Sequence, residues 1–194
     1  MIIKEAINDI INNLRDMENS IDEETVNRLI ETLTSASNVF VLGFGRSGLV
    51  AKAFAMRLMH LEINVFVVGE TITPAINEGD VLIAISGSGR TSYIVNAAGI
   101  ARERGARVVA ITSYPDSDLG KVSNLTVTIR GRTKIDGEKD YMTRQIRGNH
   151  HSRTPLGTLF EISALVFLDG LIAELMDRLD KREEDLNRRH SVFE

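Results

Sequence analysis

Two loops rich in glycine and hydroxyl residues carry the strongest chemical signal in the sequence. Residues 43–48 read Gly-Phe-Gly-Arg-Ser-Gly, and residues 86–91 read Ser-Gly-Ser-Gly-Arg-Thr. Each loop follows a short apolar run and opens into sequence that is compatible with a helix. Glycine lets a backbone approach an anion, and a helix N-terminus offers that anion free N–H groups and a partial positive charge. We therefore predict that the hydroxyl side chains of both loops bind a phosphate group. They are Ser47, Ser86, Ser88 and Thr91.

Two other interpretations of these loops must be weighed. Residues 43–48 also fit the dinucleotide-binding fingerprint, and Glu70 stands where an acid that binds ribose would be expected. A dehydrogenase normally adds a substrate domain, for which 194 residues leave no room, and the second loop would have no role. Simple turn and cap roles explain any single hydroxyl but fit the cluster less well. Phosphate binding remains the favoured interpretation.

One acid interrupts the apolar stripe of the last long helical pattern. On a helical projection from Pro155 onward, Glu161 shares a face with Leu168 and other aliphatic residues. The pair Thr158 and Glu161 also fits a capping box. However, Thr154 followed by proline offers a better helix start, which would put Glu161 in the second turn. We favour Glu161 as a general base over Glu161 as a cap.

The histidines are harder to assign. His60 lies near the end of the segment 47–61, where a lone histidine is more often a core residue or a partner of the helix dipole. His150 and His151 are adjacent, which is a poor arrangement for chelation, and we assign them to a solvated basic loop. His190, near the end of the chain, could reach a neighbouring subunit. No set of His, Asp and Glu has the spacing of metal ligands, so we predict no metal site.

The composition excludes several classes of protein. At 194 residues the chain fits one domain, and a formal charge of −4 argues against general nucleic-acid binding. Without cysteine there are no disulfides, no zinc–thiolate sites and no thiol catalysis. Neither a signal peptide nor an apolar run of membrane-spanning length is recognisable. We expect a soluble cytoplasmic protein that binds neither nucleic acid nor membrane.

The elements that must position these residues alternate along the chain. Five apolar runs rich in Val and Ile follow residue 37, at 38–42, 63–68, 81–85, 107–111 and 124–129. Helix-compatible segments lie between them at 47–61, 91–104 and 116–122. We therefore predict a single α/β domain of three layers, with a five-stranded parallel sheet flanked by helices. N-terminal helices over 1–36 precede the sheet, with Asp22 as a cap. A basic loop over 131–154 and C-terminal helices over 155–194 follow it.

The chain resembles the sugar isomerase (SIS) domain family and, within it, the 6-phospho-3-hexuloisomerases. The matching segments are 41–48, 55–61, 68–71, 86–91 and 155–161. The Ser-Gly-Ser-Gly-x-Thr loop is typical of SIS domains in general. The runs Met-Arg-Leu-Met-His and Pro-Leu-Gly-Thr-x-x-Glu narrow the resemblance to the hexuloisomerases. It extends from about residue 36 to the Arg-Arg-His tail, and the stretch 131–153 is longer than in the shortest members.

This resemblance implies a flavodoxin-like fold and a homotetramer with active sites near subunit contacts. It also implies interconversion of 3-hexulose 6-phosphate and fructose 6-phosphate without metal or cofactor. Such an enzyme acts beside hexulose-phosphate synthase in the ribulose monophosphate pathway. There it serves formaldehyde fixation or, in reverse, the supply of pentose phosphate.

The resemblance also implies roles for individual residues. It assigns phosphate binding to the four hydroxyl residues named above, and it favours Glu161 as the base of a cis-enediolate proton transfer. His60 is the candidate for a second proton carrier, with His190 in reserve, and Arg46 would steady negative charge on the phosphate or the enediolate. Two alternatives stay open. One is an isomerase of another phosphosugar such as arabinose 5-phosphate, and the other is a sugar-phosphate sensor without catalytic activity.

Overall fold

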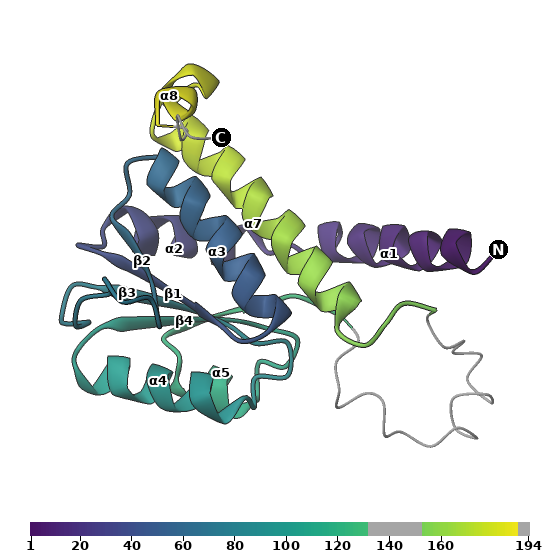
Figure 1. Ribbon diagram of the computed structural model, residues 1–194, viewed down its shortest axis with the longest axis horizontal. Helices are drawn as coiled ribbons and strands as arrows, with labels where there is room; N and C mark the ends of the chain where they lie inside the picture. The colour runs from purple at the N-terminus through teal and green to yellow at the C-terminus, as the bar shows by residue number, and fades with distance from the viewer. Residues whose placement is uncertain (132–152, 190–194) are drawn as a thin grey trace.

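A parallel β-sheet forms the centre of the fold (Figure 1). The computed structural model describes residues 1–131 and 153–189. Within these residues the strands are β1 (Val39–Gly43), β2 (Val65–Val67), β3 (Val81–Ile85), β4 (Arg107–Thr112) and β5 (Leu125–Thr128). The helices are α1 (Ile2–Glu18), α2 (Glu23–Thr34), α3 (Arg46–His60), α4 (Ser92–Glu103), α5 (Asp118–Val122), α7 (Thr158–Arg178) and α8 (Glu183–Arg188). All five predicted apolar runs form strands.

The strand order explains where a ligand can enter. The order is β2-β1-β3-β4-β5 with every pairing parallel, which is the flavodoxin-like order. From β1 the chain moves outward to β2, and from β3 it moves in the opposite direction to β4 and β5. The loops that leave β1 and β3 therefore diverge at the carboxyl edge of the sheet and open a crevice between them. The predicted α/β fold class is confirmed.

The helices cover the sheet unequally. In Figure 1, α2, α3 and α7 lie on one face of the sheet, and α4 and α5 lie on the other. Alternate strand residues serve the two layers, so Val39 and Val41 join the first core cluster, whereas Phe40 and Leu42 join the second. Because both faces are buried, the strands are continuous apolar runs rather than alternating ones.

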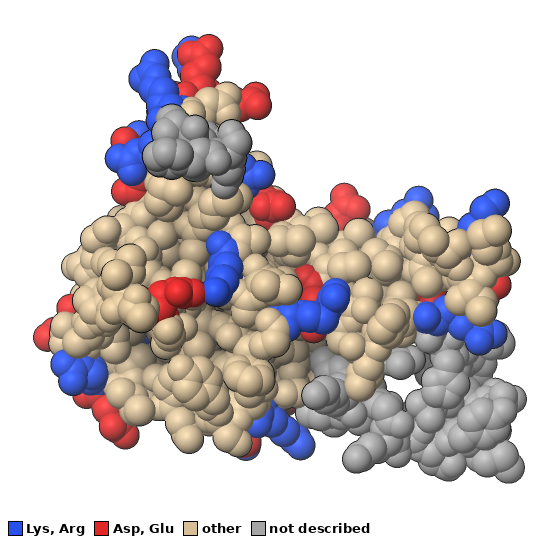
Figure 2. Space-filling view, in the orientation of Figure 1, with Lys and Arg blue, Asp and Glu red and all other residues tan. Residues whose placement is uncertain are grey.

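Helix α1 extends away from the body of the molecule (Figure 1). Its anchor to α7 is a hydrogen bond of 2.8 Å, in which the side-chain amide of Asn13 donates to the Ser163 hydroxyl. The isoleucines Ile3 and Ile7 on α1 are exposed. Charged side chains gather around α8 and along α1, whereas the surface over α3 and the adjoining part of α7 is mostly tan, with blue and red side chains side by side in two places (Figure 2). No helix within the described residues is long and apolar enough to cross a membrane.

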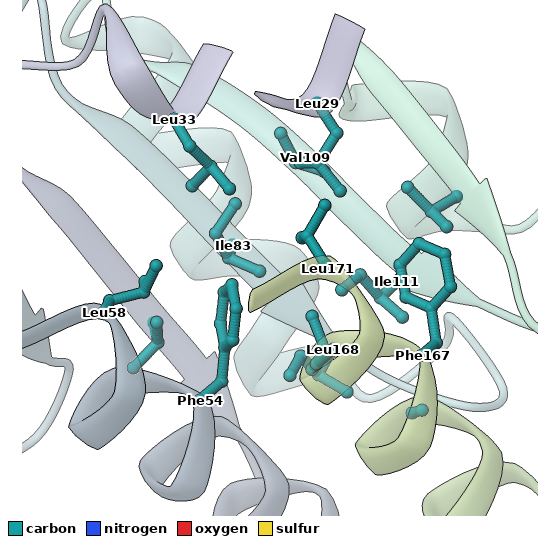
Figure 3. Packing of buried hydrophobic residues seen from close by; sticks show 14 of the residues in the cluster. Leu29, Leu33, Phe54, Leu58, Ile83, Val109, Ile111, Phe167, Leu168 and Leu171 are labelled. Carbon is teal, nitrogen blue, oxygen red and sulfur yellow. The ribbon is translucent and has the colours of Figure 1, made fainter. Parts of the chain in front are cut away.

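The larger core cluster holds α3 and α7 in fixed positions on the sheet. Phe54 and Leu58 of α3 lie close to Ile83 of the sheet, and Leu168 and Leu171 project from α7 into the same cluster (Figure 3). All five are at most 3% exposed. Truncating a buried phenylalanine to alanine in such a core costs about 3–5 kcal/mol. The N-terminal turns of α3 and α7 are therefore held at the carboxyl edge of the sheet.

The start of α7 differs from the prediction. The helix begins at Thr158 rather than at Pro155, because Gly157 adopts a left-handed conformation with φ of 92° and interrupts the path between them. Glu161 therefore lies in the first turn of α7 instead of the second. The alternative capping box is not formed either, since the N-cap is Gly157 and not Thr158. The cap predicted for α2 is confirmed, because the Asp22 carboxylate accepts the Thr25 backbone N–H at 2.9 Å.

Candidate active site

A cleft of about 570 Å³ opens at the carboxyl edge, between the loops that follow β1 and β3 and the start of α7. Six of the residues singled out in the sequence line it together. They are Arg46, Ser47, Ser86, Ser88, Thr91 and Glu161. They come from three segments that are far apart in the chain. The crevice expected at the strand-order switch is therefore also the place where these side chains converge.

The loop after β1 depends on close approach of its backbone to α3. A Cβ atom on Gly43 would lie 2.4 Å from the carbonyl oxygen of Ser47, so a larger residue does not fit there. Gly45, the N-cap of α3, has a φ of 59°, which favours glycine. The two glycines start α3 directly beside the end of the strand. This places Ser47 in the first turn of the helix, where N–H groups are free for an anion.

The loop after β3 is held by hydrogen bonds within itself. The hydroxyls of Ser86 and Thr91 lie 3.3 Å apart, and the Ser86 hydroxyl accepts the Gly89 N–H at 3.2 Å. Among the described residues, the Thr91 hydroxyl does not cap α4, although Thr91 is its N-cap residue. Thr91 is therefore not explained by capping alone. Its hydroxyl instead joins that of Ser88 in lining the cleft.

Glu161 and Arg46 form an ion pair at the wall of the cleft. The Arg46 Nε–H donates to Glu161 Oε2, and the Glu161 side chain is 15% exposed while that of Arg46 is 62% exposed. A Cβ atom on Gly157 would lie 3.1 Å from Glu161 Oε1, so the glycine leaves room for the carboxylate. The guanidinium thus fixes the direction of a carboxylate that the cleft keeps largely from water.

His60 lies elsewhere in the same chain. It is the last residue of α3, whereas Arg46 is the first, so the two ends are about 21 Å apart along the helix axis at 1.5 Å per residue. His60 is 3% exposed, at the end of α3 where the helix meets α8. Within a single chain, His60 is therefore too far from Glu161 to share a substrate with it. His190, His150, His151 and residues 132–152 of the basic loop lie outside the described residues.

Two features of the structure, one in the cleft and one outside it, were not anticipated. Phe160, 2% exposed, reaches the loop after β3 and lines the cleft, and the sequence analysis gave it no role there. Glu70, weighed earlier as a ribose-binding acid, forms an ion pair of 2.6 Å with Lys52 of α3. Neither Glu70 nor Lys52 lines the cleft. Among the described residues, no group of three His, Asp or Glu side chains could hold a metal ion.

This arrangement suits one kind of chemistry. Hydroxyl and N–H donors gather in the cleft, as an anionic phosphate requires. A carboxylate and a guanidinium line the same cleft. A small phosphorylated molecule held by the first group presents its remaining atoms to the second, where a proton can be removed and returned.

Comparisons with known proteins agree with this geometry. The SIS domain family matches residues 32–143. A protein of Aeropyrum pernix is 50% identical over 185 residues, which cover 95% of this chain and 87% of that protein. The 3-hexulose-6-phosphate isomerase of Bacillus subtilis is 36% identical over 190 residues, covering 98% of each chain.

A solved structure extends the likeness to three dimensions. It is that of a hypothetical protein from Methanococcus jannaschii, for which the function of a 3-hexulose-6-phosphate isomerase has been inferred. The two chains are 34% identical, the TM-score is 0.78, and the match covers 94% of this chain and 95% of the other.

Proposed function

We propose that this chain, which belongs to the SIS domain family, interconverts 3-hexulose 6-phosphate and fructose 6-phosphate. The observation that carries this proposal is the meeting of Glu161 and the hydroxyl-rich loop after β3 in one cleft. It is supported by isomerases of this name at 32–38% identity. The phosphate loops alone fit any phosphosugar, and these relatives are what narrow the substrate.

The phosphate is the group through which the cleft binds the substrate. Ser47 at the start of α3, with Ser86, Ser88 and Thr91 after β3, surround it with hydroxyl and N–H donors. Hydrogen bonds to a charged group are worth about 1.5–3 kcal/mol each. Holding the phosphate at one end fixes the reacting carbons opposite the carboxylate, which saves the entropy of finding that geometry during the reaction.

Glu161 moves the proton between carbons. Starting from 3-hexulose 6-phosphate, the carboxylate removes the proton on C2, and the electron pair of that bond forms the C2–C3 double bond of a cis-enediolate. The charge develops on the former carbonyl oxygen at C3, which takes up a proton. The hydroxyl on C2 then loses its proton to form the new carbonyl, and Glu161 returns its proton to C3. Arg46 aims the carboxylate and steadies the negative charge.

A second group carries the proton between the two oxygens. Our proposal assigns this role to His60, with His190 in reserve. Because His60 is far from Glu161 in its own chain and 3% exposed there, the assignment requires that the cleft of a second copy lie against the C-terminal end of α3 and that this end open to it. Separate His60→Gln and His190→Gln variants decide between them, because only the carrier lowers kcat without raising the inhibition constant of inorganic phosphate.

Self-association is part of the proposal, and we infer a homotetramer. Apolar side chains are exposed on the outer face of α3, where Leu49 is 67% and Met56 41% exposed. An apolar groove of about 490 Å³ runs between α1, α2 and α7, and Val166, 43% exposed, lines it. Contiguous apolar surface of this kind marks interfaces. Light scattering at working concentration should give about four times the chain mass of 21.5 kDa.

The reaction needs a supply of 3-hexulose 6-phosphate. We propose that the protein works in the cytoplasm beside hexulose-phosphate synthase, within the ribulose monophosphate pathway. Formaldehyde fixation and the reverse supply of pentose phosphate use the same chemistry in opposite directions.

The direct test is turnover of purified protein with fructose 6-phosphate and, separately, arabinose 5-phosphate. We expect 3-hexulose 6-phosphate from the first substrate and at most trace conversion of the second. Turnover of arabinose 5-phosphate alone would identify a different phosphosugar isomerase. Saturable binding of both compounds without turnover would identify a sensor.

A further inference from the structure

The ring of Phe160 lies directly against the phosphate loop. A Cβ atom on Gly87 would stand 2.8 Å from Cδ1 of this ring and 3.0 Å from Cγ, closer than side-chain carbons pack. Gly87 is the second residue of the loop that carries Ser86, Ser88 and Thr91. The absence of a side chain at Gly87 is therefore what allows the ring to touch the loop backbone.

Phe160 belongs to the larger core cluster and also meets a second backbone segment. A Cβ atom on Gly131 would lie 2.5 Å from both the amide nitrogen and the Cα atom of Phe160. On the far side of the loop, the carbonyl of Gly87 accepts the Ser113 N–H at 3.1 Å and the Thr112 hydroxyl at 3.3 Å. The Ser113 hydroxyl in turn donates to the carbonyl of Ile129 at 2.7 Å. Phe160 thus lies against segments that leave β3 and β5, and the segment after β4 holds the β3 loop through the Gly87 carbonyl.

Phe160 is also the residue next to Glu161 in α7. Whatever fixes the ring of Phe160 against Gly87 therefore fixes the helix turn that carries the carboxylate relative to the phosphate loop. The proposed reaction needs this distance to be constant, because the phosphate sits on C6 and the proton leaves C2 or C3. An error of about 1 Å in such an alignment can cost about 100-fold in rate.

We propose that Phe160 is a positioning residue that sets the separation between the base Glu161 and the phosphate loop. This inference rests on the proposed function for the identity of the base. This role goes beyond that of a core residue that only stabilises the fold. A second phenylalanine on the same helix provides a matched control. Phe160 and Phe167, 2% and 7% exposed, both belong to the larger core cluster (Figure 3), but of the two only Phe160 lines the cleft.

The first experiment compares Phe160→Leu with Phe167→Leu. Both remove the same atoms from a buried position of α7, so both should lower stability in urea. We expect only Phe160→Leu to lower kcat, by about tenfold or more, with the inhibition constant of inorganic phosphate changed less than about threefold. Equal kcat values for the two variants, corrected for folded fraction, would overturn the proposal.

The second experiment tests the contact from the loop side. Gly87→Ala drives a methyl group into the ring, so we expect kcat to fall by about tenfold or more. The double variant Gly87→Ala with Phe160→Leu makes room for that methyl group and should recover most of this loss. If the losses of kcat in the two single variants simply multiply in the double variant, the two residues act independently, and this result would contradict the proposal.

The wild-type protein separates this proposal from the proposed function. If it turns over no phosphosugar, the proposed reaction fails, and the positioning role is then measured by binding. The readout is the ratio of fructose 6-phosphate affinity to inorganic phosphate affinity. Phe160→Leu should lower this ratio at least about threefold while Phe167→Leu leaves it unchanged, and equal ratios would refute the role.

Discussion

The two edges of the sheet use polar residues in opposite ways. At the amino edge, the Asn38 amide donates to Asp80 at 2.7 Å, and the Asn64 amide donates to Asn38 at 2.7 Å. Asp80 also accepts the Asn77 backbone N–H at 2.8 Å and is 4% exposed. These groups bond to one another between the chain segments. At the carboxyl edge, Ser88 and its neighbours instead line an open cleft.

This difference separates polar residues that stabilise the fold from polar residues that are available to a ligand. A closed network stabilises the fold because each buried polar group has a partner, and removing one partner leaves the others unsatisfied. The hydroxyls of the loop after β3 bond within the loop but line a cleft, so a ligand can add further hydrogen bonds to them. Substitutions at the amino edge should therefore change stability, and those at the carboxyl edge should change catalysis or binding.

The largest effect is expected from Glu161→Gln. The glutamine amide has nearly the same size as the carboxylate but cannot act as a base. We therefore expect kcat to fall about 10³-fold, within the range of general-base contributions. The inhibition constant of inorganic phosphate should change less than about twofold, because the loops are intact. Glu70→Gln is the matched control, since Glu70 pairs with Lys52 outside the cleft. Similar activity of both variants would contradict the role of Glu161.

A smaller effect is expected from Thr91→Val. This change is nearly isosteric and removes one hydroxyl from the phosphate loop. The loss of one hydrogen bond to a charged group is worth about 1.5–3 kcal/mol, so KM and the inhibition constant of inorganic phosphate should rise about 10- to 100-fold. Inhibition kinetics measure this rise. An unchanged phosphate constant with a lower kcat would place the phosphate elsewhere.

At the amino edge, Asp80→Ala should act on stability alone. It leaves the Asn38 amide and the Asn77 N–H without their acceptor, which costs about 1–3 kcal/mol of unfolding free energy. Urea denaturation measures this loss, and kcat and KM of the folded protein should stay within about twofold. A large change in KM at unchanged stability would remove the contrast between the edges.

The smallest effect is expected at Asp22, which caps α2 outside the cleft. Hydrogen bonds from the hydroxyl and the backbone N–H of Thr25 lower the pKa of Asp22 below its ordinary value. A carboxyl group with a lowered pKa stabilises the fold above its unfolded-state pKa, and this stabilisation is lost as the pH falls through the folded-state value. Asp22→Ala should therefore lower Tm slightly at pH 7 and not at low pH. Equal losses at both pH values would show that the charge is not responsible.

The sequence was sufficient to predict the sheet and the components of the cleft. Continuous Val and Ile runs identify buried parallel strands, and the glycine loops that follow them must lie at the carboxyl edge. Glu161 was found because a charge within an apolar stripe is unusual. Each of these signals lies within one short segment of sequence, so it can be recognised without knowing the contacts of the folded chain.

Other features depend on contacts that no local pattern encodes. Thr154 and Pro155 have the composition of a helix start, but the left-handed backbone at Gly157 delays the helix to Thr158. The contact between Phe160 and Gly87 joins residues more than 70 positions apart. His60 is buried, as expected of a core histidine, although Leu49 and Met56 at the same helical phase are exposed. Only the packing of α7 on α3 shows that Glu161 lies at the opposite end of α3.

The most direct test of the account is proton exchange in D₂O. Fructose 6-phosphate is incubated with the wild-type protein and with Glu161→Gln, and the sugars are followed by NMR. The account predicts that 3-hexulose 6-phosphate forms and that deuterium enters the carbon next to the carbonyl with wild type only. Exchange at the wild-type rate with Glu161→Gln, or no exchange and no product with wild type, would contradict it.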